Sequence, residues 1–87
     1  MIKNNRQVQP LIIEDGFSNL ANAIILQAVK DYRDALRTLN KYPDSIEGNK
    51  MKSDGERFFR SKWFSQVTSL DGNMLLIKLK EEVMDHE

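Results

Sequence analysis

One apolar repeat in the first half of the chain constrains the fold more than any other feature of the sequence. Between residues 18 and 40, apolar side chains recur at intervals of four and three residues: Ala21, Ile25, Ala28, Tyr32, Ala35 and Leu39. This spacing places them along one side of an α-helix. The sequence therefore predicts an amphipathic helix over residues 18–40, with Val29 and Leu36 widening its apolar stripe.

The repeat also alternates in size. Alanine occupies every seventh position, and a larger side chain occupies the position between each pair of alanines. Small residues allow a neighbouring backbone to approach closely, and large residues fill the space beside it. This face is therefore expected to be core, although the same geometry would serve a homodimer in which two copies of this helix pair through the alanine column.

Local signals set the expected ends of this helix. Asp15 or Ser18 is a possible N-cap, because either side chain can accept a hydrogen bond from an unpaired backbone N–H two or three residues later. Phe17 would then pack against the first turn. The helix is expected to end within residues 40–42, because Pro43 disfavours helical geometry in the residue before it.

The length of the chain permits one small domain. The 87 residues are expected to form a single helical domain over 1–87, with residues 1–10 as a flexible tail, 11–13 as a short apolar segment and 14–16 as a break. The chain has no cysteine, so neither a disulfide nor a thiolate metal site supplements its core.

A second helix is predicted after the loop at residues 43–49, starting within residues 49–51. Gly55 would lie inside it, at a cost of about 1 kcal/mol relative to alanine. The apolar spacing continues helically beyond it through Phe59, Trp63, Val67 and Leu70. Ser61 is a possible new N-cap, so a kink or break is expected at residues 60–62.

The end of the chain has two interpretations. In the first, Asp71 and Gly72 form a turn and cap a last helix over residues 73–84, before a frayed tail at residues 85–87. The buried stripe of that helix would be Leu75, Leu76, Leu79 and Val83. In the second, residues 75–80 form a strand that pairs with residues 9–13. The methionine, leucine, lysine and glutamate content favours the helix. The prediction is an all-α bundle of three main helices, with an α+β fold containing a short N-/C-terminal strand pair as the alternative.

The charge balance argues against a strongly basic nucleic-acid-binding protein, because 13 basic residues offset 13 acidic ones. The distribution is uneven: residues 30–62 carry nine basic and six acidic residues, and residues 71–87 carry two and five. The sequence contains neither a signal-peptide pattern nor an apolar run long enough to cross a membrane. A cytoplasmic protein is therefore expected.

Residues that could carry chemistry are few. The single histidine, His86, lies next to the C-terminus, where a general base would lack a fixed position. Residues 71–73 have the residue types of a calcium loop but lack the spaced ligands of an EF-hand. No enzyme activity, cofactor or metal is predicted.

Basic residues form a stripe along the first helix. Lys30, Arg33, Arg37 and Lys41 are spaced by three, four and four residues. They are either a solvated face with local ion pairs, or an anion-binding face for an acidic protein or a phosphate backbone. Arg57, Arg60 and Lys62 would extend the anion-binding face if the second helix packs alongside.

Four aromatic residues fall within seven positions: Phe58, Phe59, Trp63 and Phe64. A single helix cannot turn all of them inward. Either a break near Ser61 turns the chain and buries all four, or part of the cluster, with Phe59 and Trp63 as candidates, is an exposed anchor for a partner. Such an anchor could also stack on unpaired bases.

Two segments resemble a known group of proteins. Residues 23–33 read Ala-Ile-Ile-Leu-Gln-Ala-Val-Lys-Asp-Tyr-Arg, and residues 57–64 read Arg-Phe-Phe-Arg-Ser-Lys-Trp-Phe, with Asp71-Gly72 following. Over roughly residues 23–83 the chain resembles small uncharacterised proteins of prophages and other mobile elements of Gram-positive bacteria. The resemblance implies a modulator of host machinery or an accessory protein of replication or regulation, and it assigns no functional residues.

The leading hypothesis is a non-enzymatic interaction protein that acts by protein–protein contact. The alternative is a nucleic-acid-binding accessory protein that uses the basic residues of the first and second helices.

Overall fold

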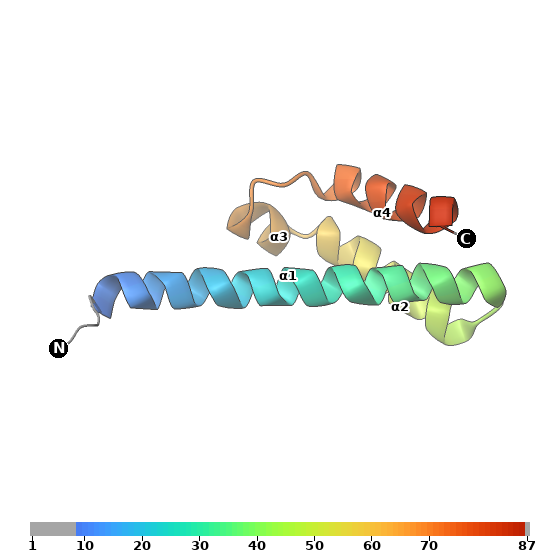
Figure 1. Ribbon diagram of the computed structural model, residues 1–87, viewed down its shortest axis with the longest axis horizontal. Coiled ribbons are helices and arrows are strands. Elements are labelled where there is room, and N and C mark those ends of the chain that lie inside the picture. Colours follow the sequence, from blue (N-terminus) through green and yellow to red (C-terminus); the bar gives the residue numbers. More distant parts are fainter. Residues whose placement is uncertain (1–8, 87) are drawn as a thin grey trace.

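The fold is all-α. The structure, a computed structural model of the chain, describes residues 9–86, with side chains over residues 18–85. In chain order the helices are α1 (Gln9–Lys41), α2 (Ile46–Phe59), α3 (Lys62–Val67) and α4 (Gly72–His86) (Figure 1). The predicted three main helices are thus confirmed as α1, α2 and α4. The alternative strand pair is wrong, because residues 9–13 and 75–80 are helical.

Helix α1 covers the predicted residues 18–40 but begins earlier, at Gln9. The predicted break at residues 14–16 and the N-caps at Asp15 and Ser18 are therefore wrong. Pro10 is tolerated in a first turn, where the missing N–H would have no partner in the helix. Gly16 lowers the stability of the helix by about 1 kcal/mol relative to alanine, which does not end a helix of this length. Of the tail predicted at residues 1–10, the last two residues are helical and residues 1–8 lie outside the description.

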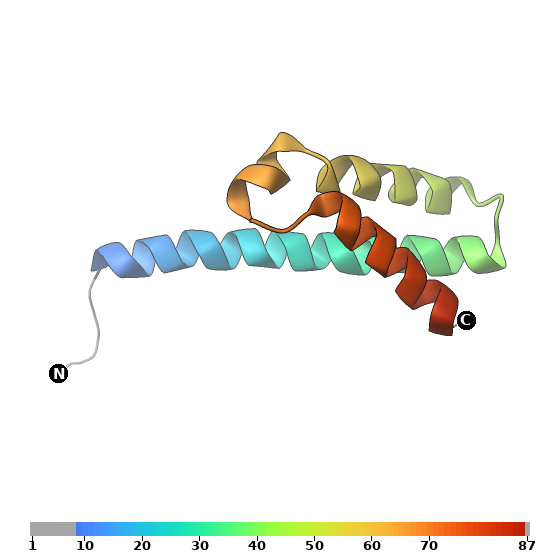
Figure 2. The same cartoon turned by 90° about the horizontal axis from the view of Figure 1, so that it is seen from above.

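Helices α2, α3 and α4 do not cover the beginning of α1. With 33 residues, α1 is about 50 Å long. It runs past α3 at its N-terminal end in both views (Figures 1 and 2). Among its described side chains, Ala21 is the first that is buried. At the other end α1 stops at Lys41, as the position of Pro43 predicted.

The core lies where α1, α2, α3 and α4 meet. Helix α2 runs back along α1, and α4 crosses one face of this helix pair (Figure 2). The buried cluster comprises Ile25, Tyr32, Leu36, Phe59, Phe64, Leu76, Leu79 and Val83. The apolar stripe predicted for the first helix is confirmed: four of its six members are buried, and Ala28 and Leu39 are half-buried. Ala21 and Ala35 of the alanine column are therefore covered within one chain, so a homodimer through these two positions would first have to uncover them.

Side-chain caps begin the three later helices. The Ser45 hydroxyl accepts a hydrogen bond from the Gly48 N–H at 3.0 Å, so α2 begins earlier than the predicted residues 49–51. The Ser61 hydroxyl accepts from the Phe64 N–H at 3.2 Å, which confirms the predicted break. Asp71 Oδ1 accepts from two backbone N–H groups at the start of α4. That helix continues to His86 rather than ending at residue 84.

One carboxylate joins three of the helices. Tyr32 Oη donates to Glu56 Oε2 at 3.0 Å, and Lys52 Nζ donates to the same oxygen at 2.8 Å. Lys80 Nζ of α4 lies 3.6 Å from it. Burial acts to raise the pKa of Glu56, but the hydrogen bonds from Lys52 and Tyr32 outweigh burial and hold that pKa below its ordinary value. Burial, followed by the hydrogen bond to Glu56, raises the pKa of Tyr32 well above its ordinary value.

Candidate interaction surface

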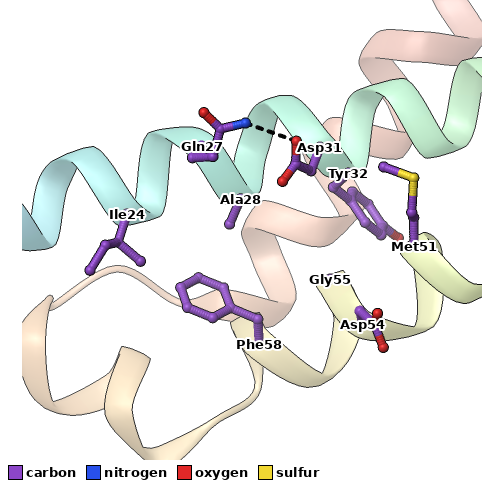
Figure 3. Close-up of a pocket in the computed structure, with 9 residues that line it drawn as sticks. All are labelled: Ile24, Gln27, Ala28, Asp31, Tyr32, Met51, Asp54, Gly55 and Phe58. Carbon is purple, nitrogen blue, oxygen red and sulfur yellow. Dashed lines mark hydrogen bonds between the residues drawn. The ribbon is translucent and has the colours of Figure 1, made fainter.

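An apolar groove lies between α1 and α2. Its volume is about 400 Å³, and the described residues that line it all belong to these two helices (Figure 3). Helix α4 lies behind the α1–α2 pair in this view. The lining residues are Ile24, Gln27, Ala28, Asp31, Tyr32, Met51, Asp54, Gly55 and Phe58. We refer to this surface as the α1–α2 groove.

The groove follows from the sizes of the residues that face each other. Gly55 on α2 packs directly against the Tyr32 ring, because a Cβ built on this glycine would lie 2.6 Å from Tyr32 Cδ1. Ala28 is a second small residue, on α1. Ala28 and Gly55 form the floor of the groove, because neither has a long side chain that would fill the space between the helices. Larger side chains form the walls, and two of them remain open to solvent: Ile24 is 41% exposed and Met51 is 38% exposed. The groove therefore offers accessible apolar surface on two rigid helices.

The aromatic cluster adjoins the groove. Because the break at Ser61 turns the chain, the rings of Phe59 on α2 and Phe64 on α3 contact each other with centroids 5.4 Å apart. Phe59 and Phe64 are buried and Phe58 is half-buried. Phe59, at 2% exposure, belongs to the core rather than to a contact surface. Two of the four rings are thus buried, so the predicted alternative in which all four are buried is wrong.

Trp63 is the ring that stays at the surface, at 36% exposure. It rests against Phe58 with ring centroids 5.6 Å apart. Phe58 lines the groove, so Trp63 extends the apolar surface beyond the groove itself. Tryptophan is enriched among the residues that contribute most to protein–protein binding.

Neighbouring polar side chains contact most of the predicted basic residues. On α1, Lys30 and Arg37 both pair with Asp34, at 3.1 and 3.7 Å. Arg33 Nη2 donates to Glu82 Oε1 of α4 at 3.0 Å. These contacts support a solvated face with local ion pairs, and they reduce the positive charge that a phosphate backbone would meet.

Arg57 and Arg60, two of the predicted basic residues that would extend the stripe, also contact polar side chains. Arg57 pairs with Asp54 at 3.3 Å, and Arg60 Nε donates to Asn73 Oδ1 at 3.0 Å. Lys41 and Lys62 are exposed.

The structure does not join the two basic groups into one face. Lys30 stands two residues from the buried Tyr32, and Arg37 stands two residues from the buried Ala35. Two residues correspond to about 200° around a helix, so this part of the stripe points away from the core and from α2. Arg57 lies on the exposed surface of α2.

Both charged residues that line the groove are acidic. Asp54 is held by Lys50 at 3.1 Å and by Arg57 at 3.3 Å, and the hydrogen bond from Lys50 is the largest contribution to its lowered pKa. Among the described residues, Asp31 accepts a hydrogen bond only from the Gln27 amide, at 2.9 Å (Figure 3). The groove thus combines apolar walls with a carboxylate that no described cation neutralises.

Metal sites and membrane-spanning helices can be assessed for the described residues. No group of three His, Cys, Asp or Glu side chains within this part of the chain is placed to hold a metal ion. None of the described helices is both long and apolar enough to cross a membrane. The side chain of His86 lies outside the description.

Part of the groove is visible in the sequence pattern. Apolar or small residues recur at helical spacing on both sides, at positions 24 and 28 and at positions 51, 55 and 58. Which of these positions face each other depends on how α2 packs on α1, and periodicity carries no information on that. No protein-family model, curated protein or solved structure matches the chain.

Proposed function

We propose that the protein is a non-enzymatic interaction protein that binds another protein through the α1–α2 groove. The observation that carries the proposal is the exposed apolar surface of the groove, held on two helices packed in the core. Isolated apolar side chains are common on protein surfaces, whereas a contiguous apolar concavity is typical of a binding site. Trp63, which continues this surface through Phe58, supports a protein as the occupant.

The resemblance to proteins of prophages and mobile elements suggests where such a partner is found. A small protein of this kind would act in the cytoplasm of a Gram-positive host and bind a component of the host machinery. Binding through an apolar groove rather than a basic face also fits a chain in which five of the seven predicted basic residues contact neighbouring polar side chains.

Site-specific photocrosslinking tests the proposal. A photoreactive phenylalanine analogue is placed at Ile24, in the groove, and in a matched variant at Ile77, which is 50% exposed on α4 outside the groove. In lysate of a Gram-positive bacterium, position 24 is expected to crosslink to a discrete protein and position 77 is not. Excess unlabelled wild-type protein should compete for that product.

The Ile24→Asp variant serves as the specificity control. Ile24 is partly exposed, so the substitution should shift the unfolding midpoint by no more than a few degrees. The folded variant should nevertheless fail to compete for the crosslinked product. Equal crosslinking at positions 24 and 77, or equal competition by the variant, would contradict the proposal.

A further inference from the structure

We infer that the occupant of the α1–α2 groove is an amphipathic helix that carries a basic side chain facing Asp31. This inference rests on the proposed function and narrows it, because it assigns the secondary structure and the charge of the segment that binds. It is carried by the shape of the groove and by its charged lining.

The arrangement of the helices favours a helix as the occupant. Helix α4 covers one face of the α1–α2 pair, and the groove lies on the face that α4 leaves open (Figures 2 and 3). A helix placed in the groove would complete a bundle in which both faces of the pair are covered. Helices in contact approach to about 8–10 Å, and the distance depends on the side chains between them. Ala28 and Gly55 at the floor allow such an approach.

The lining sets the charge of the occupant. The two charged residues of the groove are Asp31 and Asp54. Lys50 and Arg57 already engage Asp54, whereas the Gln27 amide is the described partner of Asp31 and leaves its negative charge in place. Covering that carboxylate with an apolar or acidic helix would desolvate it without compensation. A lysine or arginine at this point of the incoming helix would restore a charged hydrogen bond.

Two synthetic peptides test this inference. Both are 14-residue amphipathic helices with leucine at identical positions; one has lysine and the other glutamate at every polar position. Neither contains tryptophan, so fluorescence of Trp63, the one tryptophan of the chain, reports binding at the edge of the groove. The lysine peptide is expected to bind at least five-fold more tightly than the glutamate peptide, an advantage that decreases as salt is added.

Two carboxylate substitutions locate the effect. Asp31→Asn should weaken binding of the lysine peptide by about three- to five-fold, as expected for a partly exposed ion pair. Asp85→Asn makes the same change in net charge on α4, outside the groove, and should change the affinity by less than about 1.5-fold. Equal affinity for the two peptides, or equal effects of the two substitutions, would overturn the inference.

The Ile24→Asp variant separates this inference from the proposed function. If Ile24-dependent crosslinking occurs but the peptides show no charge preference, the groove binds a protein and the basic helix is the wrong occupant. If neither crosslinking nor peptide binding depends on Ile24, the proposed function fails as well. A wild-type dimer in light scattering that Ile24→Asp converts to a monomer would also overturn the inference, because a second copy would then occupy the groove.

Discussion

The two faces of the α1–α2 pair differ in what covers them. On one face, α4 buries Leu76, Leu79 and Val83 against the pair, and Lys80 reaches Glu56. On the other face no described helix is packed, and Ile24 and Met51 remain accessible at the rim of the groove. The same two helices thus provide the core on one side and the candidate binding surface on the other.

This difference shows how neighbouring residues of one helix serve opposite faces. Gly55 lines the open groove, and the next residue, Glu56, contacts Lys80 on the covered face. Residues of the covered face should determine the stability of the fold. Residues at the rim of the open face should affect binding far more than stability.

The largest effect is expected on the covered face. Leu76→Ala removes a side chain that is 2% exposed, and such a cavity should lower the free energy of unfolding by about 2–5 kcal/mol. Ile77→Ala is the matched control, because Ile77 is the next residue of α4 and is 50% exposed. Its cost should stay below about 1 kcal/mol. Urea unfolding followed by circular dichroism measures both, and similar losses would contradict the packing of α4 described above.

A smaller effect is expected at the floor of the groove. Helix propensity alone predicts that Gly55→Ala stabilises α2 by about 1 kcal/mol. The added Cβ would lie 2.6 Å from Tyr32 Cδ1, and Tyr32 is fully buried, so the ring has little room to move. We therefore expect a net loss of about 1–3 kcal/mol from overpacking.

Ser53→Ala, at an exposed position of α2, is the control for helix propensity and should change the stability by less than about 0.5 kcal/mol. The same urea titration compares the two variants. A stabilising Gly55→Ala substitution would show that the open face is loosely packed down to its floor.

The sequence predicted those parts of the fold that depend on local chemistry. The apolar stripe of α1, the stop before Pro43 and the caps at Ser61 and Asp71 each follow from residues close together in the chain. The predicted start of α1 is wrong because the turn-forming residues at 14–16 do not interrupt a helix that continues on both sides of them. Gly55 illustrates the limit, since the reason for a glycine inside α2 is the ring of Tyr32 on another helix.

The candidate site was less predictable than the fold for the same reason. The aromatic cluster was identified, but only the packing shows that Phe59 is core and that Trp63 stays at the surface. The basic residues were identified as well, yet their contacts with Asp34, Glu82 and Asn73 depend partly on contacts between helices. The groove was missed because it exists only where α1 and α2 face each other.

The smallest effect on stability is expected for the carboxylate of Glu56 on the covered face, and it depends on pH. Glu56→Gln removes the charge that Lys52 and Lys80 contact and should lower the free energy of unfolding by about 1 kcal/mol near neutral pH. The pKa of Glu56 is lower in the folded protein than its ordinary value, so its carboxylate form stabilises the fold. That contribution is fully present above the unfolded pKa of about 4.3. It is lost as pH falls through the lower folded pKa, because protonation then occurs in both states.

The stability difference between wild type and Glu56→Gln should therefore stay constant between about pH 7 and pH 5 and shrink as the pH falls below the unfolded pKa of about 4.3. Urea unfolding at intervals across this range measures it, with Glu81→Gln, an exposed carboxylate of α4, as the charge-matched control. A difference that persists unchanged at the acidic end would show that the Glu56 side chain stabilises the covered face by packing and neutral hydrogen bonding. A difference that shrinks for Glu56→Gln and not for Glu81→Gln would show that the charge of Glu56 stabilises the fold. This charge contacts side chains of α1, α2 and α4, so it would distinguish the covered face electrostatically from the open face.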